Sequence, residues 1–501
     1  MVMDDNSFMI ERWAQKTPEK IAVYDDAGQM SYGELAQRID VCAGELYLRG
    51  IRKGDRVLLS GSNRIQFVIA FFAILRLGAI CAVASPQYEA EEITCVSCMT
   101  EPKLILTDSQ EKWGAVKNTV SGVETAPLGF EGSARSVHEA AFPALKPDTP
   151  ALIVSTSGSS GRAKGVLLTR RNLIFPAQDI MERFHMTEKD VSFVPVPLVH
   201  MFGIMGMLVN FLSGGTMVTT AKFNGKQALE KIQTYGVSVQ YCVPTMYAKE
   251  IMEYEKTPLK LHTLRTGMIA GAPSVKQYIT WFDEQFGCRL LNAYGLTEAS
   301  ALAMVDWNDP KEVRYETAGR PCRGVELQIQ AGNGQILPVG TAGEILCRSG
   351  GVMSEYYHNR ERTKAAFTED GWFHTGDIGV IDERGCLTVT GRKKDMIIRG
   401  GYNVFPAEIE EVLLQLREVQ EVCVIGHPDS YWGEIIIAVV SPAAGSRITA
   451  ETVTDYARKH LAHYKVPDGI VFVSSLPKLP TGKYDKTTLK RELERGTLKW
   501  N

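Results

Sequence analysis

The order of hydrophobic and polar positions divides the first hundred residues into alternating strand-like and helix-like segments. Residues 56–60 and 79–84 are apolar runs of strand length, and residues 65–77 between them form an apolar stretch of helical length. Ser31 and Glu34 predict a capping box at the start of another helix. Strands that alternate with helices build mostly parallel sheets covered by helices. The pattern therefore predicts an α/β fold.

Two apolar runs at residues 151–154 and 166–168 predict a hairpin of two buried strands. The segment that joins them is almost wholly small and hydroxylated, and ends in a lysine; its candidate ligand-binding residues are Thr156, Ser157, Gly158, Ser159, Ser160, Gly161 and Lys164. Small residues let backbone N–H groups approach a ligand closely, and the lysine adds a positive charge. The segment predicts a polyphosphate-binding loop, although a flexible surface loop has a similar composition. It is not a Walker A loop, because two residues separate Gly161 from Lys164.

The pattern changes twice in the second half of the chain. Residues 320–390 carry many glycines and turn signals between short alternating runs, which predicts a small β-subdomain. The last hundred residues then read as helix, strand, strand and helix, typical of a compact α+β unit. We therefore predict a large N-terminal domain of helix-covered sheets plus the β-subdomain over residues 1–393, and a small C-terminal domain over residues 394–501.

Composition narrows the partners and the compartment. The chain has 501 residues, with 55 Lys and Arg against 58 Asp and Glu, so neither nucleic acid nor an anionic membrane is expected as its main partner. The apolar run at 67–84 is interrupted by Arg76 and Gly78 and predicts a buried helix rather than a membrane span. The ten cysteines are scattered, and Cys95 and Cys98 are expected to share a helix face rather than bind zinc. Reduced thiols and the lack of a signal-peptide pattern predict a cytoplasmic protein.

The Ser/Gly loop resembles the phosphate-binding loop of the adenylate-forming superfamily, which includes acyl-CoA synthetases, adenylation domains and beetle luciferases. Further segments resemble the superfamily's motifs in the same order along nearly the whole chain: 197-PLVH-200, 268-MIAGAP-273, 290-LLNAYGLTE-298, 371-GWFHTGD-377, 391-GRKKDMIIRGGYNVFPAEIE-410 and 476-LPKLPTGK-483. The resemblance implies an AMP-forming acid:CoA ligase that uses ATP, Mg²⁺ and coenzyme A. It also implies that the C-terminal domain is mobile.

The same resemblance implies roles for individual residues at the nucleotide. The adenine and ribose contacts are expected from Gly271, Ala272, Pro273, Asn292, Ala293, Tyr294, Gly295, Asp377, Val389 and Arg392. Thr297 is expected to meet the α-phosphate and Glu298 to bind Mg²⁺. Lys483 is expected to reach the substrate carboxylate and the α-phosphate. The residue three positions later, usually an arginine in the family, is Lys486 here.

Lys394 occupies the position of the family's hinge, about which the small domain swings between the two half-reactions. Gly400 and Gly401 follow it, and their lack of side chains would let the pantetheine arm of coenzyme A pass close to the backbone. The resemblance thus implies one active site that serves two steps in succession.

The resemblance also implies an acid-binding pocket, with His200 at its mouth. The expected pocket residues are His200, Tyr241, Tyr247, Gly271, Ala293, Ser300 and Ala301. Amino-acid-activating relatives hold the substrate ammonium with an Asp in the region that follows Val191, and this chain has none before Phe223. Because an unpaired buried ammonium is costly, an amino acid is a poor candidate. Several of the expected pocket residues are small, which leaves depth for a medium-length fatty acid or another apolar acid, with an aromatic acid as the alternative.

Three other functions fit the nucleotide motifs. A stand-alone adenylation enzyme would load its acid onto a separate carrier protein, and a luciferase-like oxygenase would share every nucleotide motif. A non-catalytic nucleotide-binding protein is disfavoured, because it would need neither the metal ligand Glu298 nor the reaching Lys483. The sequence is compatible with a monomer or a homodimer.

Overall fold

The computed structural model describes residues 10–109, 112–113, 123–128, 142–157, 163–271, 276–400, 402–479 and 483–500. The chain forms two compact units. The first consists of residues 1–271, 277–326 and 347–373, and the second of residues 272–276, 327–346 and 374–501. The predicted β-subdomain is thus shared between the units, and the predicted domain boundary at residue 393 stays a prediction.

One sheet of the first unit is mostly parallel. Its strand order is β15-β14-β13-β12-β11-β9-β10-β1-β2. Strands β13, β14 and β15 pair antiparallel at one edge, β2 pairs antiparallel at the other, and the strands between are parallel. The strands are β1 (Ile21–Tyr24), β2 (Gln29–Ser31), β9 (Val191–Phe193), β10 (Thr216–Val218), β11 (Val239–Cys242), β12 (Thr266–Ala270), β13 (Arg289–Leu296), β14 (Ser300–Met304) and β15 (Arg320–Pro321).

A second sheet of the first unit contains the predicted hairpin. Its order is β18-β8-β7-β4-β3-β5-β6, and only the pairs β7–β8 and β8–β18 are antiparallel among those described. The strands are β3 (Arg56–Ser60), β4 (Ile80–Val83), β5 (Leu104–Thr107), β6 (Glu124–Pro127), β7 (Pro150–Ser157), β8 (Ala163–Thr169) and β18 (Glu355–Tyr356). The α/β fold predicted from the alternating pattern is confirmed.

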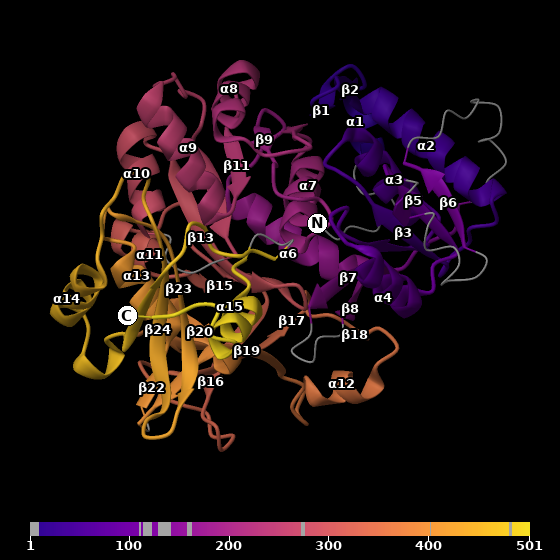
Figure 1. The fold of residues 1–501 in the computed structure, drawn as a ribbon. Helices are drawn as coiled ribbons and strands as arrows, with labels where there is room; N and C mark the ends of the chain where they lie inside the picture. The colour runs from indigo at the N-terminus through magenta and orange to yellow at the C-terminus, as the bar shows by residue number, and fades with distance from the viewer. Residues whose placement is uncertain are drawn as a thin grey trace. The chain divides into compact units, whose positions relative to one another are not determined.

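Helices cover both sheets of the first unit (Figure 1). They are α1 (Ile10–Lys16), α2 (Tyr32–Leu48), α3 (Ile65–Arg76), α4 (Ala90–Thr100), α6 (Arg170–Arg183), α7 (Met201–Ser213), α8 (Gly225–Tyr235), α9 (Pro244–Lys256), α10 (Lys276–Phe286), α11 (Lys311–Glu316) and α12 (Arg360–Ala365). The predicted capping box is present, since Ser31 accepts from the backbone of Glu34 and Glu34 accepts from the backbone of Ser31. Cys95 and Cys98 both lie on α4, as the helix prediction has it, and both are exposed.

The core of the first unit is a layer of buried helices between its two sheets. Helix α6 packs on β7 and β8 of one sheet and on β14 of the other. Helices α3 and α7 are apolar almost all round, which is typical of helices enclosed by other elements. They meet through the rings of Phe72 and Phe211, whose centroids are 5.5 Å apart. Helix α6 therefore connects the strand that leaves the Ser/Gly loop to the edge that carries β14.

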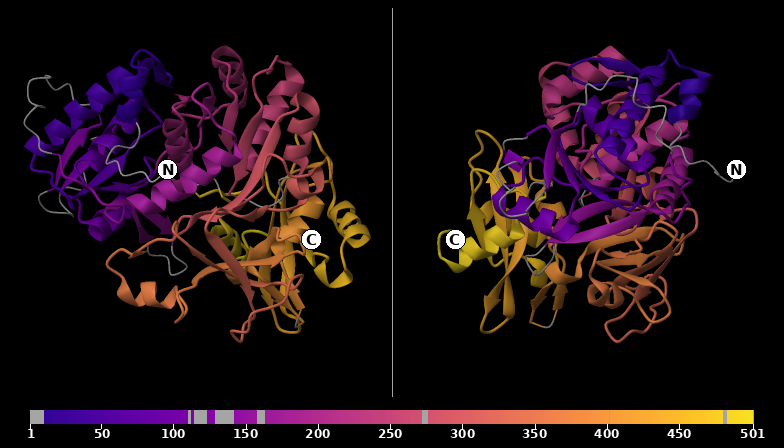
Figure 2. Two further views of the ribbon diagram at one scale, coloured as in Figure 1. Left: turned by 180° about the vertical axis from the view of Figure 1, so that it is seen from behind. Right: turned by 90° about the vertical axis from the view of Figure 1, so that its right-hand side faces the viewer.

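The second unit contains the remaining strands. Strands β16 (Val325–Gln330), β17 (Gly343–Ser349), β19 (Phe373–Ile381) and β20 (Leu387–Arg392) form a sheet that lies mostly within it. Strands β21 (Ile397–Arg399), β22 (Tyr402–Val404), β23 (Val419–Asp429), β24 (Gly433–Pro442) and β25 (Gly469–Phe472) form another, in which β23 and β24 make the long hairpin in Figures 1 and 2. Helices α13 (Pro406–Leu413), α14 (Ala450–His460) and α15 (Lys486–Glu494) accompany it.

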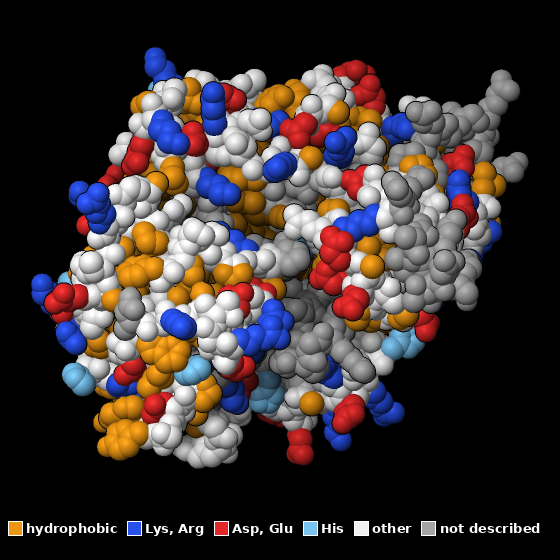
Figure 3. All heavy atoms as spheres, viewed as in Figure 1, with side chains coloured by type: hydrophobic (Ala, Val, Ile, Leu, Met, Phe, Trp, Pro, Cys, Tyr) orange, Lys and Arg blue, Asp and Glu red, His pale blue; other side chains and the backbone are white. Residues whose placement is uncertain are grey.

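The surface agrees with the near-zero net charge. Lysine and arginine side chains are interspersed with aspartate and glutamate over the face shown in Figure 3. In the part of the chain that the structure describes, no helix is both long enough and apolar enough to cross a bilayer.

Candidate active site

The predicted phosphate-loop hairpin is formed by β7 and β8. The two strands pair antiparallel, with Thr156 opposite Lys164 and Ser155 opposite Gly165. Residues 158–162 between them, and with them the predicted Gly158, Ser159, Ser160 and Gly161, lie outside the described residues. The hairpin therefore places Lys164 at the second position of the exit strand β8, next to the loop.

Lys164 is part of a compact cluster of three polar side chains. Its Nζ lies 2.5 Å from Oε1 of Glu298 and 2.8 Å from the hydroxyl of Tyr356. The Tyr356 hydroxyl in turn donates to Oε1 of Glu298 over 2.9 Å. Glu298 and Tyr356 are buried, whereas Lys164 is partly exposed. The structure thus joins two residues that the sequence analysis placed at the phosphates, Lys164 and Glu298, and adds Tyr356, which that analysis did not single out.

Glu298 stands on the tight turn between β13 and β14. Leu296 pairs with Ser300 across this turn, and the backbone N–H of Ala299 donates to the carbonyl of Leu296 over 3.1 Å. A Cβ at position 295 would lie 2.1 Å from the carbonyl oxygen of Ser300, so only glycine fits at Gly295. The turn fixes the direction in which Thr297 and Glu298 leave the sheet.

The residues expected at the adenine lie at the ends of neighbouring parallel strands. Ala270, just before Gly271, pairs with Ala293, and Tyr294 follows on the same strand. The side-chain amide of Asn292 donates to the carbonyl of Thr317 over 2.9 Å. Ala272 and Pro273 lie outside the described residues. Ligands of open α/β sheets bind at such carboxyl ends of strands, and the adenine role stays a prediction.

The residues expected at the ribose pair with each other in the second unit. Asp377 on β19 and Arg392 on β20 are register partners, and Nε of Arg392 lies 3.1 Å from Oδ1 of the buried Asp377. Val389 is opposite Gly379 on the same two strands. The structure therefore brings these three positions onto one hairpin, although no ligand contact tests their role.

The residues predicted for the hinge, the coenzyme A passage and the catalytic lysine lie in the second unit. Lys394 is exposed in a short 3₁₀ turn, residues Lys393–Asp395. Gly400 begins the β21–β22 turn, and its N–H donates to the carbonyl of Trp432 over 2.7 Å. Gly401 lies outside the described residues. Lys483 is exposed, and its carbonyl accepts from the N–H of Leu479 over 2.8 Å.

Lys486 stands where the family usually has an arginine, and its side chain contacts polar groups of neighbouring elements. Its ammonium lies 3.4 Å from Oε1 of Glu410 and 3.3 Å from the carbonyl of Val424. Burial by itself would lower the pKa of Lys486, but its charged neighbours, Glu410 first among them, together raise it. Lys486 therefore ties α15 to α13 and β23 as a charged group.

The tyrosines expected in the acid pocket face different helices. The ring of Tyr241 is fully buried against Phe184 and Phe202, and a Cβ on Gly206 of α7 would lie 3.2 Å from it. The ring of Tyr247 is fully buried against Phe282 of α10, with centroids 5.1 Å apart.

Of the other expected pocket residues, His200 and Ala301 are partly exposed, while Ala293 and Ser300 are buried. Gly271 is exposed. The predicted pocket residues thus differ in surroundings, and their shared role stays a prediction.

A buried carboxyl lies behind β11 and was not anticipated. Glu250 of α9 is fully buried, and the side-chain amide of Gln240 donates to it over 2.6 Å. Burial raises the pKa of Glu250 to about 8, although the bond from Gln240 opposes the shift. The sequence does not indicate that Glu250 is buried, although it follows Tyr247 on the same helix, because an isolated Glu in an amphipathic helix is normally solvated.

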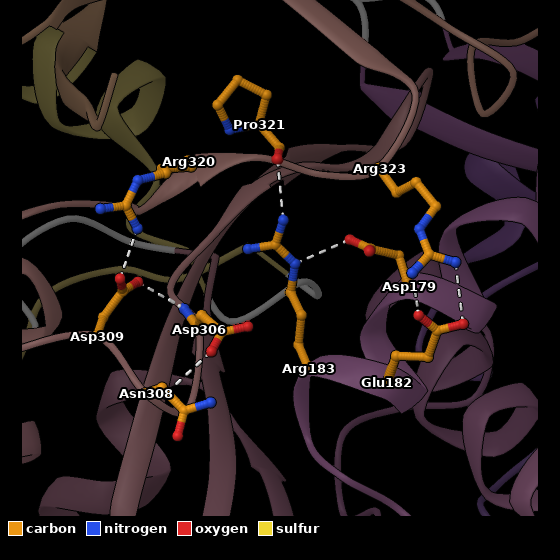
Figure 4. A pocket seen from close by; sticks show the side chains of 9 residues that line it. All are labelled: Asp179, Glu182, Arg183, Asp306, Asn308, Asp309, Arg320, Pro321 and Arg323. Atoms are coloured by element: carbon orange, nitrogen blue, oxygen red, sulfur yellow. Dashed lines mark hydrogen bonds and ion pairs between the residues drawn. The ribbon is translucent and has the colours of Figure 1, made fainter. Parts of the chain in front are cut away.

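A polar pocket lies at the C-terminal end of α6 (Figure 4). Its lining residues are Asp179, Glu182, Arg183, Asp306, Asn308, Asp309, Arg320, Pro321 and Arg323. The charges neutralise one another: Arg183 pairs with Asp179 at 2.9 Å, Arg320 with Asp309 at 2.5 Å, and Arg323 with Glu182. The Arg323–Glu182 pair and the bonds from the Arg183 guanidinium to the carbonyls of Met304 and Pro321 fasten α6 to the β14–β15 edge of the sheet.

The Glu298 cluster fits a magnesium ion that is shared with a nucleotide. Mg²⁺ is commonly held by one or two carboxylates, water and substrate phosphates rather than by a cage of protein ligands. Among the described residues, no group of three or more His, Cys, Asp or Glu side chains is arranged to hold a metal. A single buried carboxylate beside a phosphate-loop lysine is the donor set expected for a metal that arrives with ATP.

Comparisons with known proteins agree with this geometry. The model of the AMP-binding enzyme family matches residues 10–357, and that of the AMP-binding enzyme C-terminal domain matches residues 408–483. The chain is 32% identical to the oxalate–CoA ligase of Arabidopsis thaliana, over 97% of this chain and 98% of that protein. It is 30% identical to the mitochondrial medium-chain acyl-CoA ligase ACSF2 of Bos taurus, over 97% and 87%. The ATP-bound structure of MatB from Rhodopseudomonas palustris superposes with a TM-score of 0.89 at 28% identity, over 98% and 99% of the two chains.

The chain belongs to the AMP-binding enzyme family, in the acyl-CoA synthetase branch of the adenylate-forming superfamily. It is an AMP-forming acid–CoA ligase, and members of this family use ATP, Mg²⁺ and coenzyme A.

Proposed function

We propose that this ligase activates an apolar monocarboxylic acid of medium length and transfers the acyl group to coenzyme A. The observation that carries this choice is the composition of α7, the helix that follows His200. It contains no charged residue, and its buried side chains are almost all apolar. A second carboxylate on the substrate would find no cation on this helix, and burying an unpaired charge is costly.

The chemistry follows from the charges that must meet. The carboxylate oxygen of the acid attacks the α-phosphorus of ATP, pyrophosphate leaves, and a mixed anhydride with AMP forms. Because both reactants are anions, cations are needed to bring them together. Lys164 and Lys483 supply positive charge, and Glu298 would hold the Mg²⁺ that neutralises the phosphates. The thiol of coenzyme A then attacks the acyl carbon, and AMP leaves.

An aromatic acid is the second candidate for the substrate. The specific observation in its favour is the aromatic wall at Tyr241, where the rings of Phe184 and Phe202 lie with centroids 5.8 Å and 6.4 Å from that of the tyrosine. Aromatic rings pack well on one another in offset and edge-on arrangements.

ATP–pyrophosphate exchange across a panel of acids tests the proposal. The panel contains hexanoate, octanoate, decanoate, benzoate and, as a dicarboxylate control, oxalate, each run with wild type and Lys483→Ala. We expect exchange with the fatty acids, little with oxalate, and loss of exchange in the variant. Exchange with oxalate alone would contradict the choice of an apolar acid.

The acceptor is tested separately. Thioester formation is measured with coenzyme A and with a purified acyl carrier protein that bears its phosphopantetheine arm. We expect product with free coenzyme A. Product with the carrier protein only would favour the stand-alone adenylation enzyme instead.

A further inference from the structure

Tyr356 belongs to a short segment that is hydrogen-bonded both to β8, the strand that carries Lys164, and to the turn that carries Glu298. On one side, the N–H of Ser354 donates to the carbonyl of Leu167 over 3.1 Å, and that of Tyr357 to the carbonyl of Gly165 over 2.8 Å, both on β8. On the other side, the N–H of Met353 donates to the carbonyl of Glu298 over 2.6 Å. The segment therefore fixes the distance between the strand that carries Lys164 and the turn that carries Glu298.

Two side chains hold this segment from outside. The amide of Asn172, at the start of α6, donates to the carbonyls of Gly350 and Val352 over 2.8 Å and 2.9 Å. The N–H of Tyr356 donates to the hydroxyl of Thr363 on α12 over 3.0 Å. The position of the Tyr356 backbone is thus set independently of its own hydroxyl.

The hydroxyl is placed between the cation and the carboxylate. Lys164 and Tyr356 both contact Oε1 of Glu298, and within the described part of the chain Oε2 has no hydrogen-bond partner. The Lys164 ammonium also lies 4.4 Å from the centre of the Tyr356 ring, within the range of a cation–π contact.

We propose that Tyr356 is a positioning residue for magnesium-dependent nucleotide binding, an inference that rests on the proposed function. Its hydroxyl holds Glu298 through Oε1 and leaves Oε2 for the metal. It also gives Lys164 a second partner, so that the ammonium can turn from the carboxylate to the phosphates while Glu298 stays in place. Without the hydroxyl, Lys164 alone holds the carboxylate and competes with Mg²⁺ for it.

Equilibrium binding of ATP, measured by calorimetry with Mg²⁺ and with EDTA, tests this role without an acid substrate or turnover. In wild type we expect Mg²⁺ to tighten ATP binding. Tyr356→Phe removes only the hydroxyl, and we expect it to reduce that gain roughly tenfold, the size of one hydrogen bond to a charged group. Affinity in EDTA is expected to stay within about twofold, because the backbone bonds of the segment remain.

Matched variants separate positioning from a structural effect. Tyr357→Phe removes the hydroxyl of the neighbouring tyrosine and is expected to bind like wild type. In the Glu298→Gln background, Tyr356→Phe is expected to add no further loss, because the hydroxyl acts through the carboxylate. Should the Phe variant fail to fold in thermal unfolding, Tyr356→His replaces it and is expected to show a reduced Mg²⁺ gain.

Three results would overturn the inference. They are an unchanged Mg²⁺ gain in the Tyr356 variant, an equal loss with Mg²⁺ and with EDTA, and full additivity with Glu298→Gln. Wild type that binds ATP no more tightly with Mg²⁺ would overturn both the inference and the proposed metal role. Failure of the inference alone can therefore be distinguished from failure of the proposed metal role.

Discussion

The proposed phosphate end of the first unit, with Lys164, Glu298 and Tyr356, and its proposed acid end, with Tyr241 and α7, are built in different ways. At the phosphate end, Lys164, Glu298 and Tyr356 come from three separate strands and turns and contact one another through charge-assisted hydrogen bonds. At the acid end, Tyr241 lies among aromatic rings and a glycine of α7, and its hydroxyl contacts the thioether sulfur of Met186. One end depends on the identity of particular atoms and the other on the volume of side chains.

This difference has a consequence for how each end tolerates change. Hydrogen bonds to charged groups have strict geometry, so at the phosphate end even a conservative substitution is expected to remove the function of the replaced side chain. Apolar packing tolerates exchanges that conserve volume. The phosphate end should therefore respond to mutation with lost activity, and the acid end with altered selectivity.

The largest expected effect is at Glu298. Glu298→Gln keeps the shape of the side chain but removes the charge that pairs with Lys164 and that, in the proposed function, would hold the metal. We expect ATP–pyrophosphate exchange to fall roughly 10²–10³-fold, the typical cost of one transition-state electrostatic contact. The measurement is the exchange rate at saturating ATP, with the fold verified by thermal unfolding. A loss smaller than tenfold would show that the two ends do not differ in the way described.

The next effect concerns selectivity at the acid end. Tyr241→Ala opens space between β11 and α7, so we expect kcat/KM to rise for longer acids relative to shorter ones, by roughly tenfold per methylene accommodated. The change is also expected to cost about 3–5 kcal/mol of stability, as for other buried aromatic truncations. The panel of acids used for exchange measures the first effect and chemical denaturation the second.

Tyr247→Ala is the matched control for this experiment. It removes a ring that is equally buried but packs on α10. We expect a similar loss of stability and no change in chain-length preference. A shift in preference with Tyr247→Ala and none with Tyr241→Ala would place the acid on the other side of β11.

The same contrast explains which parts of the molecule are predictable from the sequence. The Ser/Gly hairpin and the Glu298 turn have local signatures: apolar runs that flank the hairpin, and Gly295, whose replacement would collide with Ser300. The hairpin was predicted and its two strands are present. At Glu298 the resemblance predicted a role at the metal, and the turn itself was not anticipated. Tyr356 was missed because its role depends on β18 pairing with β8, which lies almost two hundred residues away in the chain.

The acid end and the domain division were less predictable for a related reason. Tyr241 and Tyr247 look equivalent in the sequence, and only the packing of α7 and α10 distinguishes them. The β-subdomain was expected to belong wholly to the N-terminal part, but its segments divide between the two compact units. Side-chain packing and long-range strand pairing leave no local pattern in the amino-acid sequence from which they could be predicted.

The smallest expected effect tests the same comparison at Glu250, a titratable side chain that is buried in apolar packing behind the acid end. Its pKa rises from the usual 4.5 to about 8 because it is buried. The folded protein therefore holds a proton that the unfolded chain releases above about pH 4.5, and stability falls as pH rises from 4.5 toward 8, by at most about 1.4 kcal/mol per pH unit. Glu250→Gln cannot ionise, keeps a polar group of the same size beside Gln240, and is expected to flatten this dependence. Urea unfolding at pH 6 and pH 8, followed in parallel for wild type and variant, measures the difference. Equal slopes in both proteins would mean that Glu250 ionises within the fold, and that the space behind β11 is more polar than its contacts indicate.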